Sequence, residues 1–549
     1  MHVRLVLAAV LALTACQVPP VPGVSTPTPT PAGIVEAGGI LRVALTADAT
    51  TLDPWNANDT NTMLVTRQIF ETLVDYDLAG FKIVPKLAET WSVSSDGRVW
   101  TFALRRGVKF HDGTDLDAAA VVLNFDRARQ AAHPLRGPAL SGSPYRAYAA
   151  LLEGFDDASA IVRVEARDAA TVVITTKTPF GPLLADLAMP SFAIVSPKSM
   201  RDDPAGWSRP STRGAAGTGP FVFRPGAWQP GQQIALDRNP EYWTKDQAGS
   251  AVPYADRVVL RVIKDEAARI TELRSGGLDA VRDVTPLTLP AVRGDPNLQV
   301  LVRPAATTTY LGIAAGAPFD RVEVRRAIAM AVDKSLLATT LFSGAGRSAS
   351  QLLPPGTLGY DPSLRGNDYD PDQARSLMRQ AGLAGGFRVE YRTWESDEFN
   401  NSGQLALIVE DLAAIGIQID INRYTAVEAR KPLQRAGHGM AFCGNWYADF
   451  PDSDNFFYVF FHSDSGSARG FYYHRPELDA QIIEARRSND IERRTEIYRQ
   501  LDGMVVREAP FVPLFHERLF VLTKPQVRGV RTSLVPPPVR YHEAWVEES

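Results

Sequence analysis

Cysteine is scarce in this sequence, and its scarcity restricts the metal sites that the chain can hold. Among 549 residues only Cys16 and Cys443 are cysteines, and neither belongs to a CxxC or CxxH pair. A zinc site with the usual ligand spacing is therefore excluded, and we expect no metal and no cofactor. Cys443 lies in a strand-like stretch, where we expect it to pack as a small apolar side chain.

The sequence motifs of common enzymes are missing as well. There is no G-x-S-x-G and no H-E-x-x-H, and the eight histidines are scattered singly. The GTGPF stretch at 217–221 lacks the third glycine and the Lys-Ser/Thr pair of a phosphate-binding loop. His111 and Asp112 are read as part of a β-turn rather than as an acid–base pair.

We therefore predict that the chain is not an enzyme and has no catalytic residues. A hydrolase acting on cell-wall peptides is kept as the alternative, because the sequence alone cannot place two carboxylates across a substrate.

Neither an excess of positive charge nor a long internal apolar run is present. The chain has 58 basic and 62 acidic residues, a formal net charge of −4, so nothing suggests a nucleic-acid partner. No stretch after residue 15 is long and apolar enough to cross a bilayer. The length exceeds that of one ordinary core, and the hydrophobic content of 45% is typical of globular proteins, so two or more lobes are expected.

The N-terminus has the features of an export signal followed by a tether. A short basic start and an apolar run from Leu5 to Leu13 predict a signal peptide over residues 1–15. The residues Leu13-Thr14-Ala15-Cys16 resemble a bacterial lipobox, which implies cleavage after Ala15 and acylation of Cys16. Residues 16–37 are predicted to be the lipidated cysteine and a tether rich in proline and threonine, and the stretch 17–33 can extend up to ~50 Å.

The remaining chain alternates strand-like and helix-like patterns, which favours an α/β fold. We expect a buried strand at 39–45, a helix at 62–74, a hairpin around Ser95-Asp96-Gly97, and a helix at 118–129 capped by Asp117. A β-α-β pattern follows in the second half, with strands at 387–391 and 417–421 on either side of a helix at 404–415.

The stretch from Met440 to His462 is the best candidate for a functional site. A strand-like alternation ends near Trp446 and leads into an acidic loop, which is followed by an apolar run at 456–461. A solvated turn accounts for Pro451, Asp452 and Ser453, which are turn formers. Asp449 lies between aromatic residues, where we expect a part-buried carboxylate that can receive a cation.

Several motifs resemble family 5 of the bacterial extracellular solute-binding proteins. They cover about residues 38–549 and are the W-x-x-D at 446–449 with the DSDNF run at 452–456, the LAETW…DG…GVKFHDG series at 87–113, GTGPF at 217–221, NPEYW at 239–243, and FDRVEVRRAIAMAVDK at 319–334.

This resemblance implies a two-lobed clamshell of the periplasmic-binding-protein type (type II, cluster C), with an extra subdomain in the first lobe. The expected divisions are lobe I at 38–304 with the subdomain at about 80–215, lobe II at 305–510, and a return to lobe I at 511–549.

The implied function is capture of a peptide-like or other cationic small solute outside the cytoplasmic membrane, by a monomer that delivers it to an ABC permease with its ATPase subunits. In the peptide-binding members an aspartate pairs with the α-ammonium of the ligand, and the match puts that role on Asp449.

Three aromatic residues are further candidates for the ligand cleft. Trp446 would form an apolar wall, with a core position as the alternative, and Trp394 and Tyr145 match stretches that line the cleft in relatives. Where dipeptide binders tend to carry an arginine, this chain has Glu395, Asp397 and Glu398. The departure favours a longer or more cationic ligand, and a non-peptide ligand such as a metal chelate, an opine or a glycoside remains the alternative.

Overall fold

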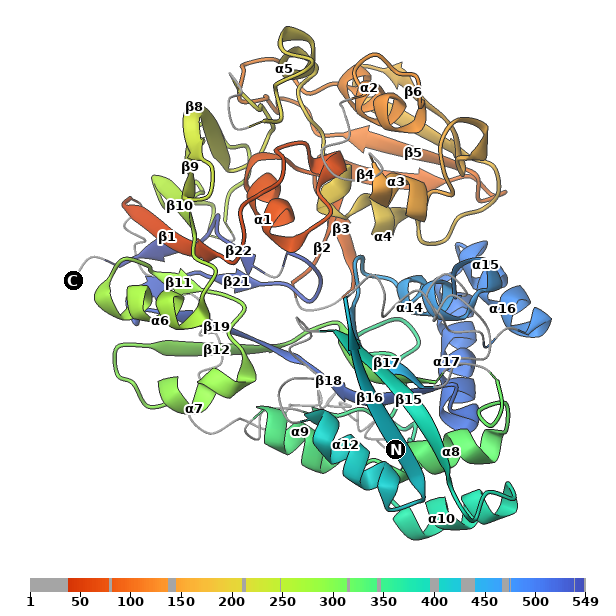
Figure 1. Cartoon of the computed structure of the whole chain (residues 1–549). Coiled ribbons are helices and arrows are strands. Elements are labelled where there is room, and N and C mark those ends of the chain that lie inside the picture. Colours follow the sequence, from red (N-terminus) through yellow and green to blue (C-terminus); the bar gives the residue numbers. More distant parts are fainter. Residues whose placement is uncertain are drawn as a thin grey trace, which may run out of the picture.

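The computed structural model describes residues 38–547 except for short internal gaps, at 79–80, 137–144, 210–213, 247, 314–315, 343–346, 395–403, 426–439, 467–472, 474 and 538. The predicted signal peptide, Cys16 and the predicted tether lie outside the described residues. Among the helices that are described, none is long and apolar enough to cross a membrane. Figure 1 shows three parts, which are a sheet-based body, a subdomain above it, and a second lobe joined to the body by crossing strands.

Lobe I is built on a mixed seven-stranded sheet in the order β12-β19-β11-β1-β10-β9-β8. Its strands are β1 (Ile40–Leu45), β8 (Phe221–Gln229), β9 (Gln233–Arg238), β10 (Arg257–Val262), β11 (Ala280–Val281), β12 (Gln299–Pro304) and β19 (Arg518–Thr523). Leu41, Val43 and Leu45 of β1 are buried, and β1 pairs in parallel with β10. The strand expected at 39–45 is thus confirmed at the centre of the sheet.

Helices and short ribbons surround this sheet. They are α1 (Thr60–Ile69), α6 (Glu266–Ser275) and α7 (Leu289–Val292), with the two-stranded pairs β2 (Val74–Tyr76)–β3 (Ile83–Pro85), β20 (Val527–Arg528)–β23 (Trp545–Val546) and β21 (Arg531–Thr532)–β22 (Val539–Arg540). The C-terminal ribbons pack against the lobe I core.

The helix expected at 62–74 is shorter than predicted at its C-terminal end. Asp59 caps α1, but the helix ends at Ile69, and the chain is extended at Phe70 and paired as β2 from Val74. The Ile69 carbonyl accepts from the N–H of Gly219 instead of from a further helical turn. A Cβ at Gly217 would lie 2.1 Å from that same carbonyl oxygen, so only glycine allows this approach.

Glu71, just after α1, explains why two of the sequence motifs occur together. Its buried carboxylate accepts hydrogen bonds from Thr218 of GTGPF at 2.8 Å and from Tyr242 and Trp243 of NPEYW at 2.7 and 2.8 Å. Lys86 adds an ion pair at 2.8 Å. A buried carboxylate is tolerated only when it is paired and hydrogen-bonded. Residues of both motifs therefore have a structural role, because they stabilise the buried carboxylate of Glu71, which supports the structural interpretation of GTGPF.

The extra subdomain is a four-stranded antiparallel sheet in the order β4-β5-β7-β6, covered by helices. Its elements are β4 (Ala88–Val93), β5 (Val99–Leu104), α2 (Ala118–Arg129), α3 (Arg146–Leu151), β6 (Ile161–Asp168), β7 (Thr171–Thr176), α4 (Leu183–Leu187) and α5 (Pro197–Asp202). The β4–β5 hairpin and the Asp117 cap, which accepts from the N–H of Ala120 at 2.8 Å, are confirmed. His111 is held by the backbone of Gly217 and Gly219, which supports its structural interpretation.

Lobe II combines a second four-stranded sheet with a parallel pair. The sheet order is β14-β18-β13-β17, from β13 (Thr307–Ile313), β14 (Arg347–Ser348), β17 (Met440–Tyr447) and β18 (Phe511–His516); the pair is β15 (Phe387–Trp394) with β16 (Ile417–Tyr424). Its helices are α8 (Val322–Ala331), α9 (Lys334–Phe342), α10 (Pro371–Gln380), α12 (Gln404–Ala413), α14 (Asp454–Phe461), α15 (Ser463–Gly466), α16 (Pro476–Arg486) and α17 (Ile491–Glu508). The predicted β-α-β unit is present, with parallel strands.

Two crossings join the lobes. The first runs from β12 to β13 through Ala305 and Ala306. The second falls at Glu517, because β18 pairs with β13 in lobe II whereas β19 pairs with β12 in lobe I. The predicted divisions of the chain into lobes stay a prediction.

Candidate ligand-binding site

The end of β17 lies directly against the first crossing between the lobes. Tyr447 is paired with Thr307, and the next residue, Ala448, donates its N–H to the carbonyl of Ala306 at 2.8 Å. The N–H of Ala306 in turn donates to the carbonyl of Leu534 in lobe I at 3.0 Å. The backbone just before Asp449 is therefore hydrogen-bonded to Ala306, in the first crossing between the lobes.

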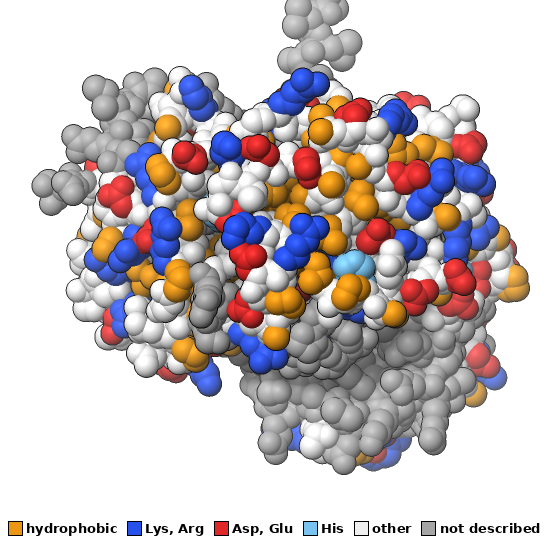
Figure 2. Space-filling view, turned by 90° about the horizontal axis from the view of Figure 1, so that it is seen from above, with side chains coloured by type: hydrophobic (Ala, Val, Ile, Leu, Met, Phe, Trp, Pro, Cys, Tyr) orange, Lys and Arg blue, Asp and Glu red, His pale blue; other side chains and the backbone are white. Residues whose placement is uncertain are grey.

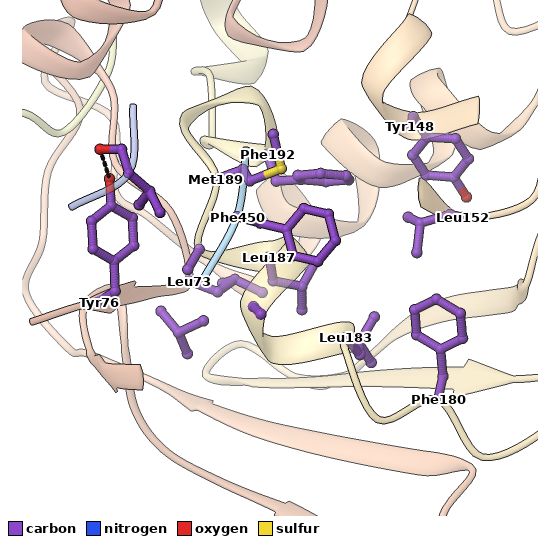
Figure 3. Packing of buried hydrophobic residues seen from close by; sticks show 14 of the residues in the cluster. Leu73, Tyr76, Tyr148, Leu152, Phe180, Leu183, Leu187, Met189, Phe192 and Phe450 are labelled. Atoms are coloured by element: carbon purple, nitrogen blue, oxygen red, sulfur yellow. Dashed lines mark hydrogen bonds between the residues drawn. The ribbon is translucent and has the colours of Figure 1, made fainter. Parts of the chain in front are cut away.

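Phe450 fixes the backbone on the other side of Asp449. Its ring is buried with side chains of the extra subdomain, and Figure 3 shows it among Leu187, Met189 and Phe192. Ala448 and Phe450 are both almost fully buried, but Asp449 between them is exposed. The expected part-buried carboxylate is therefore corrected to an exposed carboxylate on a fixed backbone, at the junction of the two lobes.

Asn455 is a residue of this site that the sequence analysis did not single out. Its side-chain oxygen accepts from the indole N–H of Trp446 at 2.9 Å and from the backbone N–H of Asp449 at 3.0 Å. Asn455 itself is 1% exposed, so the acceptor of both hydrogen bonds is buried. One amide thus sets the orientation of the tryptophan ring and of the aspartate backbone, and its place in the DSDNF run was the available signal.

Trp446 is half-buried and lies against the apolar core. Its ring is edge-on to Phe460 of α14, with ring centres 5.1 Å apart. It therefore partly fills the core position that we kept as the alternative, and a role as a wall of the cleft stays a prediction.

The acidic loop is not a solvated turn. Asp452 and Asp454 are 5% and 3% exposed, and Ser453 is fully buried. Arg494 of α17 lies 2.7 Å from Asp452, and Arg486 of α16 lies 2.8 Å from Asp454. The cations that these carboxylates need come from the protein itself, which corrects the expected turn at 451–453.

Tyr145 is placed in the interior of the subdomain. Its side chain is fully buried, and its hydroxyl accepts from Arg127 at 2.8 Å. Arg127 also forms a two-pronged ion pair with Asp53, with N–O distances of 2.8 and 2.9 Å. A solute in the cleft could reach this ring only by displacing its neighbours, and a role of Tyr145 in the cleft stays a prediction.

The other predicted site residues are described only in part. Trp394 ends β15, and its side chain lies outside the described residues, as do Glu395, Asp397 and Glu398. The side chain of Cys443 in β17 is likewise not described. Within the described part of the chain, no group of three or more His, Cys, Asp or Glu side chains could hold a metal ion.

A two-lobed fold that carries the W-x-x-D and DSDNF motifs where the lobes meet agrees with the match to a known protein family. Residues 82–468 match the model described as bacterial extracellular solute-binding proteins, family 5 middle. The chain belongs to this family. As a family 5 solute-binding protein it is the extracytoplasmic, solute-binding component of an ABC importer, as its sequence predicted.

Individual relatives match the family 5 protein over most of its length. It is 33% identical to di/tripeptide-binding protein 2 of Pseudomonas aeruginosa, over 85% of this chain and 87% of the relative. It is 30% identical to heme-binding protein A of Haemophilus influenzae, over 84% of each chain. The structure of the periplasmic binding protein DppA from Helicobacter pylori with the peptide STSA superposes with a TM-score of 0.75 at 26% identity, covering 93% of this chain and 99% of that one.

These similarities confirm the two-lobed binding-protein fold. The relatives are named as binding proteins and not as enzymes, in agreement with the absence of catalytic motifs.

Proposed function

We propose that this protein captures a short peptide, or a peptide-like solute with a cationic group, by pairing that group with the carboxylate of Asp449. The observation that carries the proposal is that Asp449 is exposed while its backbone is fixed at the lobe junction by Ala448, Phe450 and Asn455. A carboxylate on a fixed backbone loses little conformational entropy when a ligand binds. Closure of the lobes would then remove water and strengthen the ion pair.

The named ligands of the relatives support a peptide but leave a second class to be tested. One relative is named for di- and tripeptides, and the superposed structure holds the peptide STSA. Another relative is named for heme, and a further structure with the same fold, from Brucella suis, holds Fe(III)-EDTA. The second candidate function is therefore binding of a metal chelate or another non-peptide solute.

Matched probes separate the two candidates. Thermal melting is measured with dialanine, trialanine, tetra-alanine, N-acetyl-trialanine and heme. We expect the free-amine peptides to raise the melting temperature and N-acetyl-trialanine to leave it unchanged, because acetylation removes the positive charge of the α-amino group. Stabilisation by heme alone would support the second candidate, and equal stabilisation by acetylated and free peptide would exclude the proposed charge pairing.

We also propose that the mature protein is held at the membrane by a lipid on Cys16, with residues 17–37 as the tether and the folded body as a monomer. The lipobox-like residues 13–16 and the proline-rich composition support this arrangement. Replacing Cys16 with serine should move the protein from the membrane fraction to the soluble extracytoplasmic fraction. A native protein that is already soluble would exclude the anchor.

A further inference from the structure

The turn between α16 and α17 of lobe II docks onto the extra subdomain. We call residues 486–494 the docking corner. The carbonyl of Arg486 accepts from the N–H of Gly181 at 2.7 Å, and Asn489 donates to the carbonyl of Gly97 at 3.0 Å. A Cβ at Gly181 would lie 2.2 Å from the carbonyl oxygen of Ser488, so the two surfaces are in close contact. These contacts exist only while the subdomain and lobe II are together.

Arg486 extends from the docking corner into the subdomain. Its guanidinium donates to the carbonyl of Leu151 at 3.0 Å and to Asp454 at 2.8 Å, and it lies 5.0 Å from the ring centre of Phe180. The side chain is 4% exposed. A charged group from lobe II is thus buried against the subdomain.

Around Arg486, buried carboxylates outnumber buried guanidinium groups. Three carboxylates, Asp186 from the subdomain and Asp452 and Asp454 from lobe II, cluster with two guanidinium groups among the described residues, those of Arg486 and Arg494. Asp452 and Asp454 each have an arginine partner. Oδ1 of Asp186 has no hydrogen-bond partner among the described residues, although Asp186 is 1% exposed. An ionised Asp186 would leave a buried negative charge without compensation.

Other ionisable groups face the cluster from the elements around it. They are Glu153 after α3, Tyr458 of α14, Tyr498 of α17 and, stacked on Tyr458, His462. Glu153 adds negative charge, the tyrosines add no positive charge, and the imidazole of His462 lies 3.8 Å from Asp464 instead. None of these neighbours is paired with Asp186 among the described residues.

We propose that Asp186 takes up a proton when the extra subdomain and lobe II come together, so that the proton acts as a co-ligand of lobe closure. With the lobes apart, water hydrates Asp186, and its carboxyl ionises in the ordinary range near pH 3.9. With the lobes together, Asp186 is buried and its Oδ1 has no hydrogen-bond partner among the described residues, and protonation brings the three carboxylates and two guanidinium groups to balance. The inference depends on the movement of the lobes and not on the identity of the solute.

The direction of the pKa shifts agrees with this geometry. Burial raises the pKa of Asp186 well above its usual value, and burial raises the pKa of Asp454 to about 6. The closed form therefore binds more protons than the open form between the ordinary pKa of Asp186 and its raised value. Closure is favoured as the pH falls through this window, by up to about tenfold per pH unit for one proton.

Small-angle X-ray scattering of the unliganded protein tests the proposal without any solute. The radius of gyration is measured from pH 5.0 to 8.5 for the native chain, Asp186→Asn and the exposed control Asp157→Asn. We expect the native and control proteins to become more compact as the pH falls. Asp186→Asn, which carries no charge at any pH, should be as compact at pH 8.5 as the native protein is at pH 5.0.

A second variant keeps the test decisive if Asp186→Asn does not fold. Gly181→Val places its side chain against Ser488 of the other lobe and should keep the radius large at every pH. A native radius that does not change with pH would overturn the proposal, and so would a pH dependence that persists in Asp186→Asn or Gly181→Val. Failure of peptide binding would leave these results untouched, so the two hypotheses fail separately.

Discussion

The N–H of Ala448 lies 2.8 Å from the carbonyl oxygen of Ala306, and this hydrogen bond links the first crossing between the lobes to the residue before Asp449. A change in backbone angle at Ala305 or Ala306 would therefore shift the aspartate directly. Hinges in two-lobed proteins are a few residues at the ends of elements, which describes this position. The hydrogen bond between Ala306 and Ala448 would therefore couple lobe movement to the position of Asp449 and so to ligand binding.

Gly181→Val is expected to oppose closure by steric contact alone. The new side chain would meet the backbone of Ser488 in the other lobe, whereas both lobes keep their own cores. We predict at least a tenfold weaker affinity for trialanine by calorimetry, with an unchanged circular dichroism spectrum. The control is Gly385→Val, in an exposed turn where a Cβ would meet nothing within 4 Å. Equal affinities of the two variants would mean that the docking corner is not part of ligand-driven closure.

Asn455→Ala is expected to weaken ligand binding indirectly, by loosening the positions of Trp446 and Asp449. The substitution removes the acceptor shared by Trp446 and the Asp449 N–H, and the loss of each buried hydrogen bond costs about 1–3 kcal/mol. We predict a lower free energy of unfolding in urea, together with weaker peptide binding measured well below the melting temperature. As a control, Asn422→Ala removes an exposed asparagine that bonds to Glu390 and should change neither quantity. Native-like peptide affinity in Asn455→Ala would show that Asn455 does not position Asp449.

Tyr145→Phe separates a core role from a cleft role. The hydroxyl accepts from buried Arg127, so its removal should lower the free energy of unfolding by about 1–3 kcal/mol. Because Tyr145 is not accessible, we predict unchanged affinity for trialanine at a temperature where the variant is fully folded. A variant with native stability and impaired binding would instead support a role of Tyr145 in ligand binding.

The sequence predicted local features well where the signal was itself local. The Asp117 cap, the β4–β5 hairpin and the parallel β15–β16 pair depend on neighbouring residues and on periodicity, and all are confirmed. The early end of α1 was missed because the Ile69 carbonyl is taken by Gly219, which is distant in the sequence. Tertiary contacts of this kind override local helix propensity.

The errors at the site have the same origin. Asp452 has the composition of a solvated turn, and only the fold brings Arg494 within 2.7 Å of it. Tyr145 lies in a stretch matched to relatives and is buried with its hydroxyl on Arg127, and its place in the cleft stays a prediction. Asp449, in contrast, was singled out from the W-x-x-D motif, and the structure places it at the lobe junction. Its role in ligand binding stays a prediction.

Acidification is expected to destabilise the protein through His516. This buried side chain at the end of β18 has its Nδ1 3.3 Å from the carbonyl oxygen of Thr307, and burial lowers its pKa to about 4. The unfolded chain protonates the histidine below about pH 6.5, before the folded protein does, so stability is lost as the pH falls from about 6.5 to 4.

The loss should be up to about 3 kcal/mol for one histidine. Urea unfolding of the native protein and of His516→Gln at several pH values measures this loss. Between about pH 6.5 and 4 the variant should take up fewer protons on unfolding than the native protein, by up to one proton. An identical dependence in both proteins would contradict this assignment.

The central claim is that the carboxylate of Asp449 holds a cationic group of the solute. Calorimetry of native protein, Asp449→Asn and the exposed control Asp157→Asn, each with trialanine, tests it most directly. Losing one partner of a desolvated charge pair costs roughly 2–5 kcal/mol, so Asp449→Asn should bind about 30-fold to 5,000-fold more weakly while the control binds like the native protein. Native affinity in a folded Asp449→Asn protein would contradict the account.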